Sequence, residues 1–251
     1  MALLSELNES EPVKMLVIGD SGGGKTGSLA SLVKAGYKLH ILDFDNGTAI
    51  LGKLLDKDSQ SKVEIEKFQD KMKATPTGLV VDGMPKAFVG SLKTLTEWTG
   101  KYKDKKDIIV IDSFSFLSNA VMRYTLAQAG RPNGPAQLQD WGIAQNYLTN
   151  VLSLLYSSDI TCSVLILAHI KYLEADGGLK QAQVNTLGSA LPPTVGRYFN
   201  NMVWVGMYGG KRVIKTKASP TMALKTSAPG LVKDQYELET GMAEIFKALE
   251  G

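Results

Sequence analysis

The stretch GDSGGGKT, residues 19–26, constrains the fold more than any other part of the chain. It matches the pattern G-x-x-x-x-G-K-[ST] in full, and it lies between the apolar run KMLVIG and the helix-like run TGSLASLVKAG. Glycines in such a loop let successive backbone N–H groups converge on phosphate oxygens, and the following helix adds its positive end. The alternative is a plain glycine turn before an ordinary helix, but the strand before and the helix after favour a phosphate-binding loop.

The residues of this loop have separate expected roles. Lys25 is predicted to hold the β and γ phosphates as a point charge, and the Thr26 hydroxyl is predicted to ligate Mg²⁺. ATP and Mg²⁺ are therefore the expected cofactors. The predicted nucleotide-binding residues are Gly19, Asp20, Ser21, Gly22, Gly23, Gly24, Lys25, Thr26 and Gly27.

Apolar runs alternate with amphipathic runs along the chain, which predicts an α/β fold with a mostly parallel sheet and crossover helices. The predicted strands cover 13–19, 38–44, 107–112, 163–169 and 202–208, the first four buried on both faces. Helices are predicted over 25–35, 85–99, 115–129 and 137–157.

Turn signals add antiparallel pieces to this parallel pattern. The run MVWVGMY, the pair Gly209-Gly210 and the run KRVIKTK predict a hairpin near the C-terminal end. Three further segments, 74–85, 129–137 and 173–193, are predicted to be irregular and exposed, the last with room for a hairpin that turns at Asp176-Gly177-Gly178.

Two acidic residues follow predicted strands at the positions where a P-loop enzyme needs them. Asp112 ends the apolar strand DIIVID and is the predicted carboxylate ligand of Mg²⁺, with helix capping as the alternative. The next residue is Ser113, not the glutamate that in many ATPases activates the attacking water. Asp45 is therefore the predicted water-orienting base, since ligands lie outside the carboxyl ends of parallel strands. Alternation places Asp43 on the same side, and Asp45 could instead cap a helix beginning near Gly47.

Charge is distributed unevenly although the net charge is only +3. Nine Lys or Arg against two acids lie between Lys171 and Lys233, whereas the last eighteen residues carry one Lys and five acids. A basic segment of this size suggests a polyanionic partner, with ordinary solvated faces as the alternative. The predicted organisation is an N-terminal extension over 1–12, one ATPase domain over 13–233 and an acidic helix or tail over 234–251.

Neither a basic leader nor an apolar run long enough for a signal peptide opens the chain, and no later run reaches the length of a spanning helix. The expected location is the cytoplasm, with no membrane partner.

The combination of phosphate loop, acid after the next strand and DIIVIDS strand resembles the RecA-type ATPase core over roughly residues 13–230. The resemblance is nearest to phage-borne nucleotide-binding proteins of that superfamily, some of which are ATP-responsive single-strand annealing recombinases. It implies a RecA-like sheet ending in antiparallel strands, and a bacterial host cytoplasm if the protein is phage-encoded. It also implies that Asp45 stands where a catalytic glutamate is more usual, and that His169 senses the γ phosphate where RecA has glutamine.

The same resemblance implies that a cation enters the neighbouring subunit's ATP site, so that hydrolysis depends on assembly into a ring or filament. Lys215 and Lys217, in the run IKTK, match the paired lysines that RecA uses in this way. Lys225 and Arg197 are competing candidates, and a solvated basic strand is the alternative.

Two loops fall where RecA-like proteins grip single-stranded DNA. The first offers only Arg131, and the second offers Lys171, Tyr172 and Lys180, with Arg197 and Tyr198 beyond it. Cations that follow phosphates and aromatic rings that stack on bases suit strand binding without sequence readout.

The leading hypothesis is an ATPase that acts on single-stranded DNA in recombination or replication, together with other proteins of those processes. A non-catalytic or weakly catalytic ATP-dependent scaffold that recruits a helicase, a nuclease or another partner is the first alternative. A P-loop small-molecule kinase is the second, although its arginine-rich lid would have to come from the four widely spaced residues Arg123, Arg131, Arg197 and Arg212.

Overall fold

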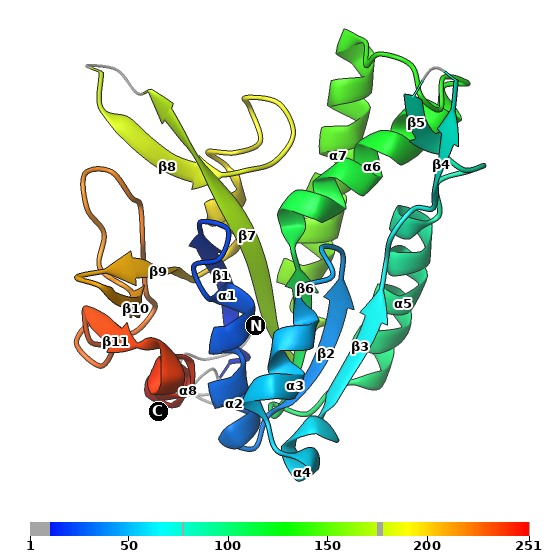
Figure 1. The fold of residues 1–251 in the computed structure, drawn as a ribbon. Helices are drawn as coiled ribbons and strands as arrows, with labels where there is room; N and C mark the ends of the chain where they lie inside the picture. The colour runs from blue at the N-terminus through cyan, green and yellow to red at the C-terminus, as the bar shows by residue number, and fades with distance from the viewer. Residues whose placement is uncertain (1–10, 77, 175–177, 251) are drawn as a thin grey trace, which may run out of the picture.

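The computed structural model describes residues 11–76, 78–174 and 178–250. Its strands are β1 Lys14–Gly19, β2 Lys38–Asp43, β3 Val63–Lys67, β4 Met72–Thr75, β5 Gly78–Val81, β6 Asp107–Asp112, β7 Ser163–Glu174, β8 Lys180–Val184, β9 Asn201–Tyr208, β10 Lys211–Lys215 and β11 Gln235–Glu237. Its helices are α1 Lys25–Ser28, α2 Ala30–Lys34, α3 Leu51–Leu54, α4 Lys57–Gln60, α5 Ala87–Lys101, α6 Phe114–Gln128, α7 Leu138–Tyr156 and α8 Leu238–Glu250. Figure 1 shows their arrangement.

The central sheet has the order β11-β10-β9-β1-β7-β6-β2-β3. From β9 to β3 every pairing is parallel, whereas β10 and β11 are antiparallel to their neighbours. The strand that carries the phosphate loop, β1, therefore lies beside β7, and β7 separates it from β6. Strand β7 runs on beyond the sheet and pairs with β8 in an antiparallel hairpin (Figure 1).

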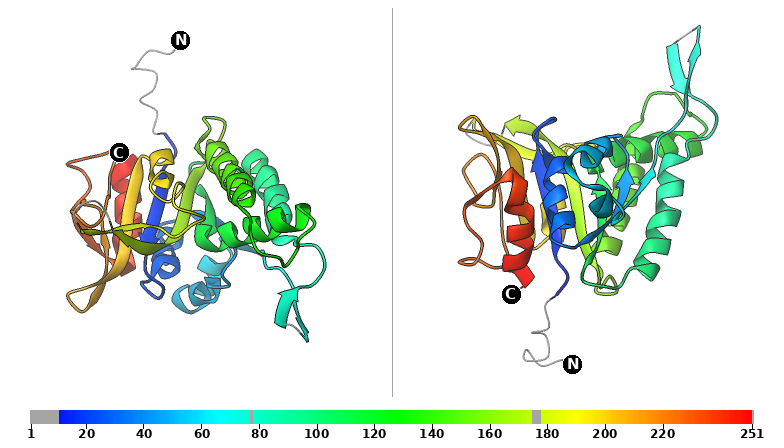
Figure 2. Two further views of the ribbon diagram at one scale, coloured as in Figure 1. Left: turned by 90° about the horizontal axis from the view of Figure 1, so that it is seen from above. Right: turned by 60° about the horizontal axis from the view of Figure 1, so that its bottom comes forward.

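Helices cover both faces of this sheet because its central strands are apolar on both sides. Strands β1, β6 and the first half of β7 are buried almost throughout. One face packs against α5, α6 and α7, and the other against α1, α2 and α8, which contributes Phe246 with no exposed surface. Figure 2 shows these layers from two further directions. The two cores hold the carboxyl ends of β1, β7, β6 and β2 along one edge.

The predicted α/β fold with a parallel sheet and C-terminal antiparallel strands is confirmed. Two predictions need correction. Residues 74–85 are not wholly irregular, because β4 and β5 pair as a hairpin that projects from the body of the molecule (Figure 2). The helix predicted over 25–35 is divided at Leu29, which separates α1 from α2.

Some predicted features fall partly or wholly outside the described residues. These are the N-terminal extension up to residue 10, and the turn residues Asp176 and Gly177. The strands on either side of that turn are described, with Glu174 opposite Lys180. Among the described helices, none is long and apolar enough to cross a membrane.

A buried histidine joins the starts of the two strands that carry the site's acids. His40 of β2 has its Nδ1 atom 3.1 Å from Glu64 of β3 and its Nε2 atom 3.0 Å from Asp107 of β6. Its ring stacks on Tyr102 with the centroids 3.4 Å apart. Side-chain bonds therefore support the register that places Asp43 opposite Asp112 at the other end of these strands.

We expect the substitution His40→Leu to lower the free energy of unfolding by about 2 kcal/mol, because it removes the imidazole that is hydrogen-bonded to the buried Asp107 carboxylate. Chemical denaturation monitored by circular dichroism measures the change. The control Glu64→Gln removes charge from a half-exposed partner and should cost at most about 0.5 kcal/mol. Equal stability of His40→Leu and the unmodified protein would show that these bonds do not support the register.

Candidate nucleotide-binding site

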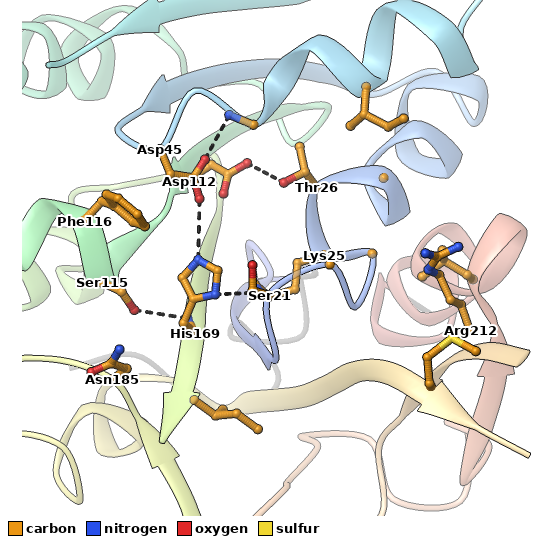
Figure 3. Close-up of a pocket in the computed structure, with 18 of the residues that line it drawn as sticks. Ser21, Lys25, Thr26, Asp45, Asp112, Ser115, Phe116, His169, Asn185 and Arg212 are labelled. Carbon is orange, nitrogen blue, oxygen red and sulfur yellow. Dashed lines mark hydrogen bonds and ion pairs between the residues drawn. The ribbon is translucent and has the colours of Figure 1, made fainter. Parts of the chain in front are cut away.

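The phosphate loop follows β1 at the edge where the parallel strands end. Two of its glycines are required by their surroundings. A Cβ atom on Gly19 would overlap the carbonyl oxygen of Val205 in β9. Gly24 has φ of 107°, in the left-handed region, and a Cβ there would lie 2.9 Å from Leu238 of α8. The loop borders a pocket of about 1440 Å³ (Figure 3).

Lys25 is buried and points back along its own loop. Its ammonium group donates to the carbonyl oxygens of Gly19 at 3.0 Å and Asp20 at 2.9 Å. Burial lowers the pKa of Lys25 from its ordinary value, while the negative charges of Asp112 and Asp45 oppose that shift. The amine is thus held at the pocket wall by neutral carbonyl groups, which a phosphate could replace as a stronger, charged partner.

Thr26 and Asp112 form a pair of oxygen ligands beside Lys25. The Thr26 hydroxyl donates to the Asp112 carboxylate at 2.7 Å. Burial, followed by the charge of Asp45, raises the pKa of Asp112 to about 7. A buried carboxylate and a hydroxyl, neither bonded to a cationic side chain in the described part of the chain, fit a hard divalent cation that favours the charged carboxylate.

The described residues contain no cluster of three His, Cys, Asp or Glu side chains that could hold a metal ion. At a nucleotide site, Mg²⁺ usually takes two oxygen ligands from the protein, and phosphate and water supply the rest of its coordination shell. Thr26 and Asp112 would hold it, and the bound ion would offset charge on the phosphate oxygens.

The two acids after β2 have different positions. Asp43 is fully buried and accepts hydrogen bonds from the Asn46 amide at 2.7 Å and the Thr48 hydroxyl at 2.6 Å. Asp45 lines the pocket, and its Oδ1 atom accepts from the Gly47 amide at 3.0 Å. Asp43 therefore binds the turn that follows β2, and the short helix after Gly47 has no side-chain cap. The second carboxylate oxygen of Asp45 faces the site.

His169 lies between Lys25 and Asp45. Its Nδ1 atom is 3.3 Å from the Lys25 ammonium group, and its Nε2 atom is 3.6 Å from Asp45 Oδ2. Because an ammonium group can only donate, Nδ1 must accept, which leaves the ring proton on Nε2 toward Asp45. The neighbouring imidazole holds the pKa of Asp45 below its ordinary value. The structure brings the predicted base, sensor and phosphate-binding lysine into one continuous group (Figure 3).

Sequence reasoning missed the residues that hold this histidine in place. The Ser115 hydroxyl accepts from the His169 amide at 3.1 Å, and the Asn185 amide donates to the His169 carbonyl at 2.7 Å. The ring of Phe116 meets the imidazole edge to face at 6.0 Å between centroids. The only signal for Ser115 and Phe116 was their place just after Asp112, at the start of a helix that follows a strand end.

The predicted trans cations do not line the pocket of their own chain. Lys217 pairs with Asp234 at 2.8 Å on the surface, and the ammonium group of Lys215 lies 3.1 Å from the ring centroid of Tyr208. Lys225 and Arg197 are exposed and also lie outside the pocket lining. Arg212, which sequence reasoning considered only for a kinase lid, does line the pocket.

Some of the predicted DNA-binding residues are exposed, whereas others are bonded to the protein itself. Tyr172 and Lys180 are exposed on the β7–β8 hairpin, where the strand pairing puts both on one face. Lys171, on the other face, donates to the carbonyl oxygens of Thr186 and Gly188, at 3.4 and 3.3 Å. Arg131 lies elsewhere and makes two 2.8 Å bonds to Asp140, which itself caps α7. That ion pair gives Arg131 a structural role, so the structure adds no support to its predicted DNA contact.

The glycine loop with its buried lysine, and the Thr26–Asp112 pair at the ends of parallel strands, are the parts of a P-loop nucleotide-binding site. A family model described as "AAA domain" matches residues 11–227. The chain belongs to this family.

Other comparisons give distant likenesses. No curated protein matches the sequence. Among solved structures, the RadB recombinase is similar at 12% identity with a TM-score of 0.45, over 84% of each chain. A prototypical ATPase from the type III secretion system of pathogenic bacteria has the same identity and TM-score over 78% of this chain and 51% of that one. The assembled ATPase EscN of the enteropathogenic E. coli type III secretion system is also 12% identical with a TM-score of 0.45, over 78% of this chain and 43% of that one.

Proposed function

We propose that this ATPase domain hydrolyses ATP with Mg²⁺ and acts on single-stranded DNA, as a ring or filament, in recombination or replication. Lys25 holds the terminal phosphates, Thr26 and Asp112 hold the metal ion, and Asp45 orients the attacking water. His169 senses the γ phosphate and passes its presence to the DNA-binding hairpin.

The observation that carries this proposal is the group Lys25–His169–Asp45, in which one imidazole contacts both the phosphate-binding and the water-orienting side chains. A γ phosphate that draws Lys25 toward itself removes the hydrogen-bond donor from Nδ1 of His169. The ring then turns to the phosphate or to Asp45, so its position depends on the nucleotide.

The position of His169 in β7 supports a route from nucleotide to hairpin. His169 is the last residue of β7 paired to β1, opposite Gly19, and the neighbour β6 ends opposite Leu167. The next residue, Ile170, begins the pairing with β8. A movement of His169 is therefore a movement at the base of the hairpin that carries Tyr172 and Lys180.

A coupling test follows from this position. We expect single-stranded DNA to raise the ATPase rate of the unmodified protein, and His169→Gln, which retains a polar side chain, to lower the ratio of DNA-stimulated to basal rate at least about threefold with little change in the basal rate. Steady-state phosphate release with and without an oligonucleotide measures both rates. Binding of the same oligonucleotide should weaken steeply as salt rises.

Two results would contradict the proposal. A rate that is indifferent to DNA in the unmodified protein favours the scaffold alternative. A flat salt response would remove the argument from the basic segment between Lys171 and Lys233.

A further inference from the structure

The two ends of a bound nucleotide can be assigned to opposite sides of the phosphate loop. Lys25, Asp45 and His169 mark the end where the terminal phosphate belongs. The pocket continues past Gly24 to a second wall, formed by the β9–β10 turn and the start of α8. Figure 3 shows Arg212 on this wall, across the loop from His169.

Arg212 is placed at this wall by its aliphatic stem. Its Cδ atom would lie 3.2 Å from a Cβ on Gly24, and Leu238 packs against the same position. No hydrogen bond or ion pair joins the guanidinium group of Arg212 to any other residue that the structure describes. An exposed, planar cation is thus fixed at its base beside the loop and free at its tip.

The neighbours of Arg212 indicate which part of a nucleotide this wall suits. Met207, which is 56% exposed, and Leu238 supply apolar surface, and Glu237 and Glu239 supply carboxylates. Lys211 also lines this wall, but its ammonium group lies 3.9 Å from Glu237, so the two charges offset each other. Carboxylates repel phosphate but accept hydrogen bonds from ribose hydroxyls. A guanidinium group stacks favourably on the face of an aromatic ring. The set fits a base and a ribose better than a further anion.

We propose that Arg212 and Leu238 hold the nucleoside of the bound nucleotide, with the guanidinium on the face of the base and Leu238 beneath it. The ligand class is a purine nucleoside triphosphate, whose base gives the guanidinium the larger aromatic face. The pocket volume of about 1440 Å³ has room for a whole nucleotide, since ligand pockets usually occupy about 300–1,000 Å³. This inference rests on the proposed nucleotide chemistry of the phosphate loop and adds the part that recognises the base.

The test compares ATP with inorganic tripolyphosphate, which has the phosphates without the nucleoside. Arg212→Met keeps the stem over Gly24 and removes the planar cation, so the loop stays packed. We expect it to weaken ATP binding about tenfold in calorimetry and to leave tripolyphosphate binding within about twofold. Arg212→Lys should lose most of the same affinity because an ammonium group cannot stack, and Leu238→Ala should act in the same direction. The control Arg123→Met removes a half-exposed arginine of α6 that does not line the pocket. It should leave the affinities for ATP and for tripolyphosphate unchanged.

Other results would overturn the proposal, and each would point to a different alternative. Parallel loss of ATP and tripolyphosphate, with rescue by Arg212→Lys, would make Arg212 a phosphate ligand. Unchanged ATP affinity in Arg212→Met and Leu238→Ala would place the nucleoside elsewhere, for example against Ile50 and Leu54. An unmodified protein that binds neither ligand would overturn the proposed nucleotide function as well, whereas binding of tripolyphosphate alone would overturn only the nucleoside site.

Discussion

Asp45→Asn is expected to lower the rate of ATP hydrolysis about 10³-fold while ATP binding stays intact. The amide fits the same space and can still accept from the Gly47 amide, so the turn after β2 should keep its shape. It cannot accept a proton from the attacking water. Loss of a negative charge near the γ-phosphate position should leave ATP affinity equal or slightly higher, because Asp45 repels phosphate.

Single-turnover hydrolysis and equilibrium binding of ATP separate these two effects. The control Asp58→Asn changes an exposed carboxylate of α4 and should leave both quantities unchanged. If Asp45→Asn hydrolysed ATP at the unmodified rate, the base would have to be another residue. Among the residues that the structure describes, two other carboxylates end the neighbouring strands: Asp112, assigned to the metal ion, and Asp43, whose two oxygens accept hydrogen bonds from Asn46 and Thr48. Glu237 and Glu239 lie on the opposite wall of the pocket.

Lys25→Ala is expected to weaken ATP binding by about 10²-fold and to abolish measurable hydrolysis, because it removes charge-assisted bonds to two phosphates. Fluorescence titration with a labelled nucleotide and phosphate release measure the two losses. Lys34→Ala, at the exposed end of α2, is the matched control and should behave as the unmodified protein. ATP affinity within threefold of the unmodified value would mean that the loop amides, not the lysine, supply most of the binding.

The same variant tests whether a cation enters the site from a neighbouring subunit. Lys217→Ala keeps its own phosphate loop, whereas Lys25→Ala keeps its own Lys217. Mixed assemblies should therefore contain some complete sites and regain part of the activity that each variant lacks alone. No recovery at any mixing ratio would count against Lys217 acting between subunits.

The sequence was informative wherever one local pattern decided the structure. The phosphate loop, the buried strands and the acid at the end of β6 each depend on a few neighbouring residues, and their places in the fold follow the prediction. Asp45 could be proposed because it follows a strand end, and His169 because the family resemblance implies a γ-phosphate sensor at that position, although β7 continues past it to Glu174. Their contact with Lys25 could not be derived, since it depends on the order of β1, β7, β6 and β2 in the sheet.

Arg212 shows what sequence reasoning missed and why. It lies 188 positions after Gly24 in the chain, and no spacing rule connects an arginine in a hairpin with a distant glycine loop. The β3 strand and the β4–β5 hairpin were missed for a different reason. Their residues are largely exposed, so burial imposes little hydrophobic pattern on them.

The place of β1 in the sheet has a consequence for how the domain is made. Among the described strands β1 comes first in the chain, yet its two neighbours are β7 and β9, and the Val205 carbonyl oxygen that leaves no room for a side chain at Gly19 is more than 180 residues away. Because such distant pairings form late, the sheet that holds the loop is incomplete on a growing chain until β9 has left the ribosome. ATP then binds only the completed domain and stabilises it by mass action, by about 4 kcal/mol at a thousandfold excess over Kd. The cellular nucleotide pool would thus protect finished molecules from unfolding and give no help to unfinished ones.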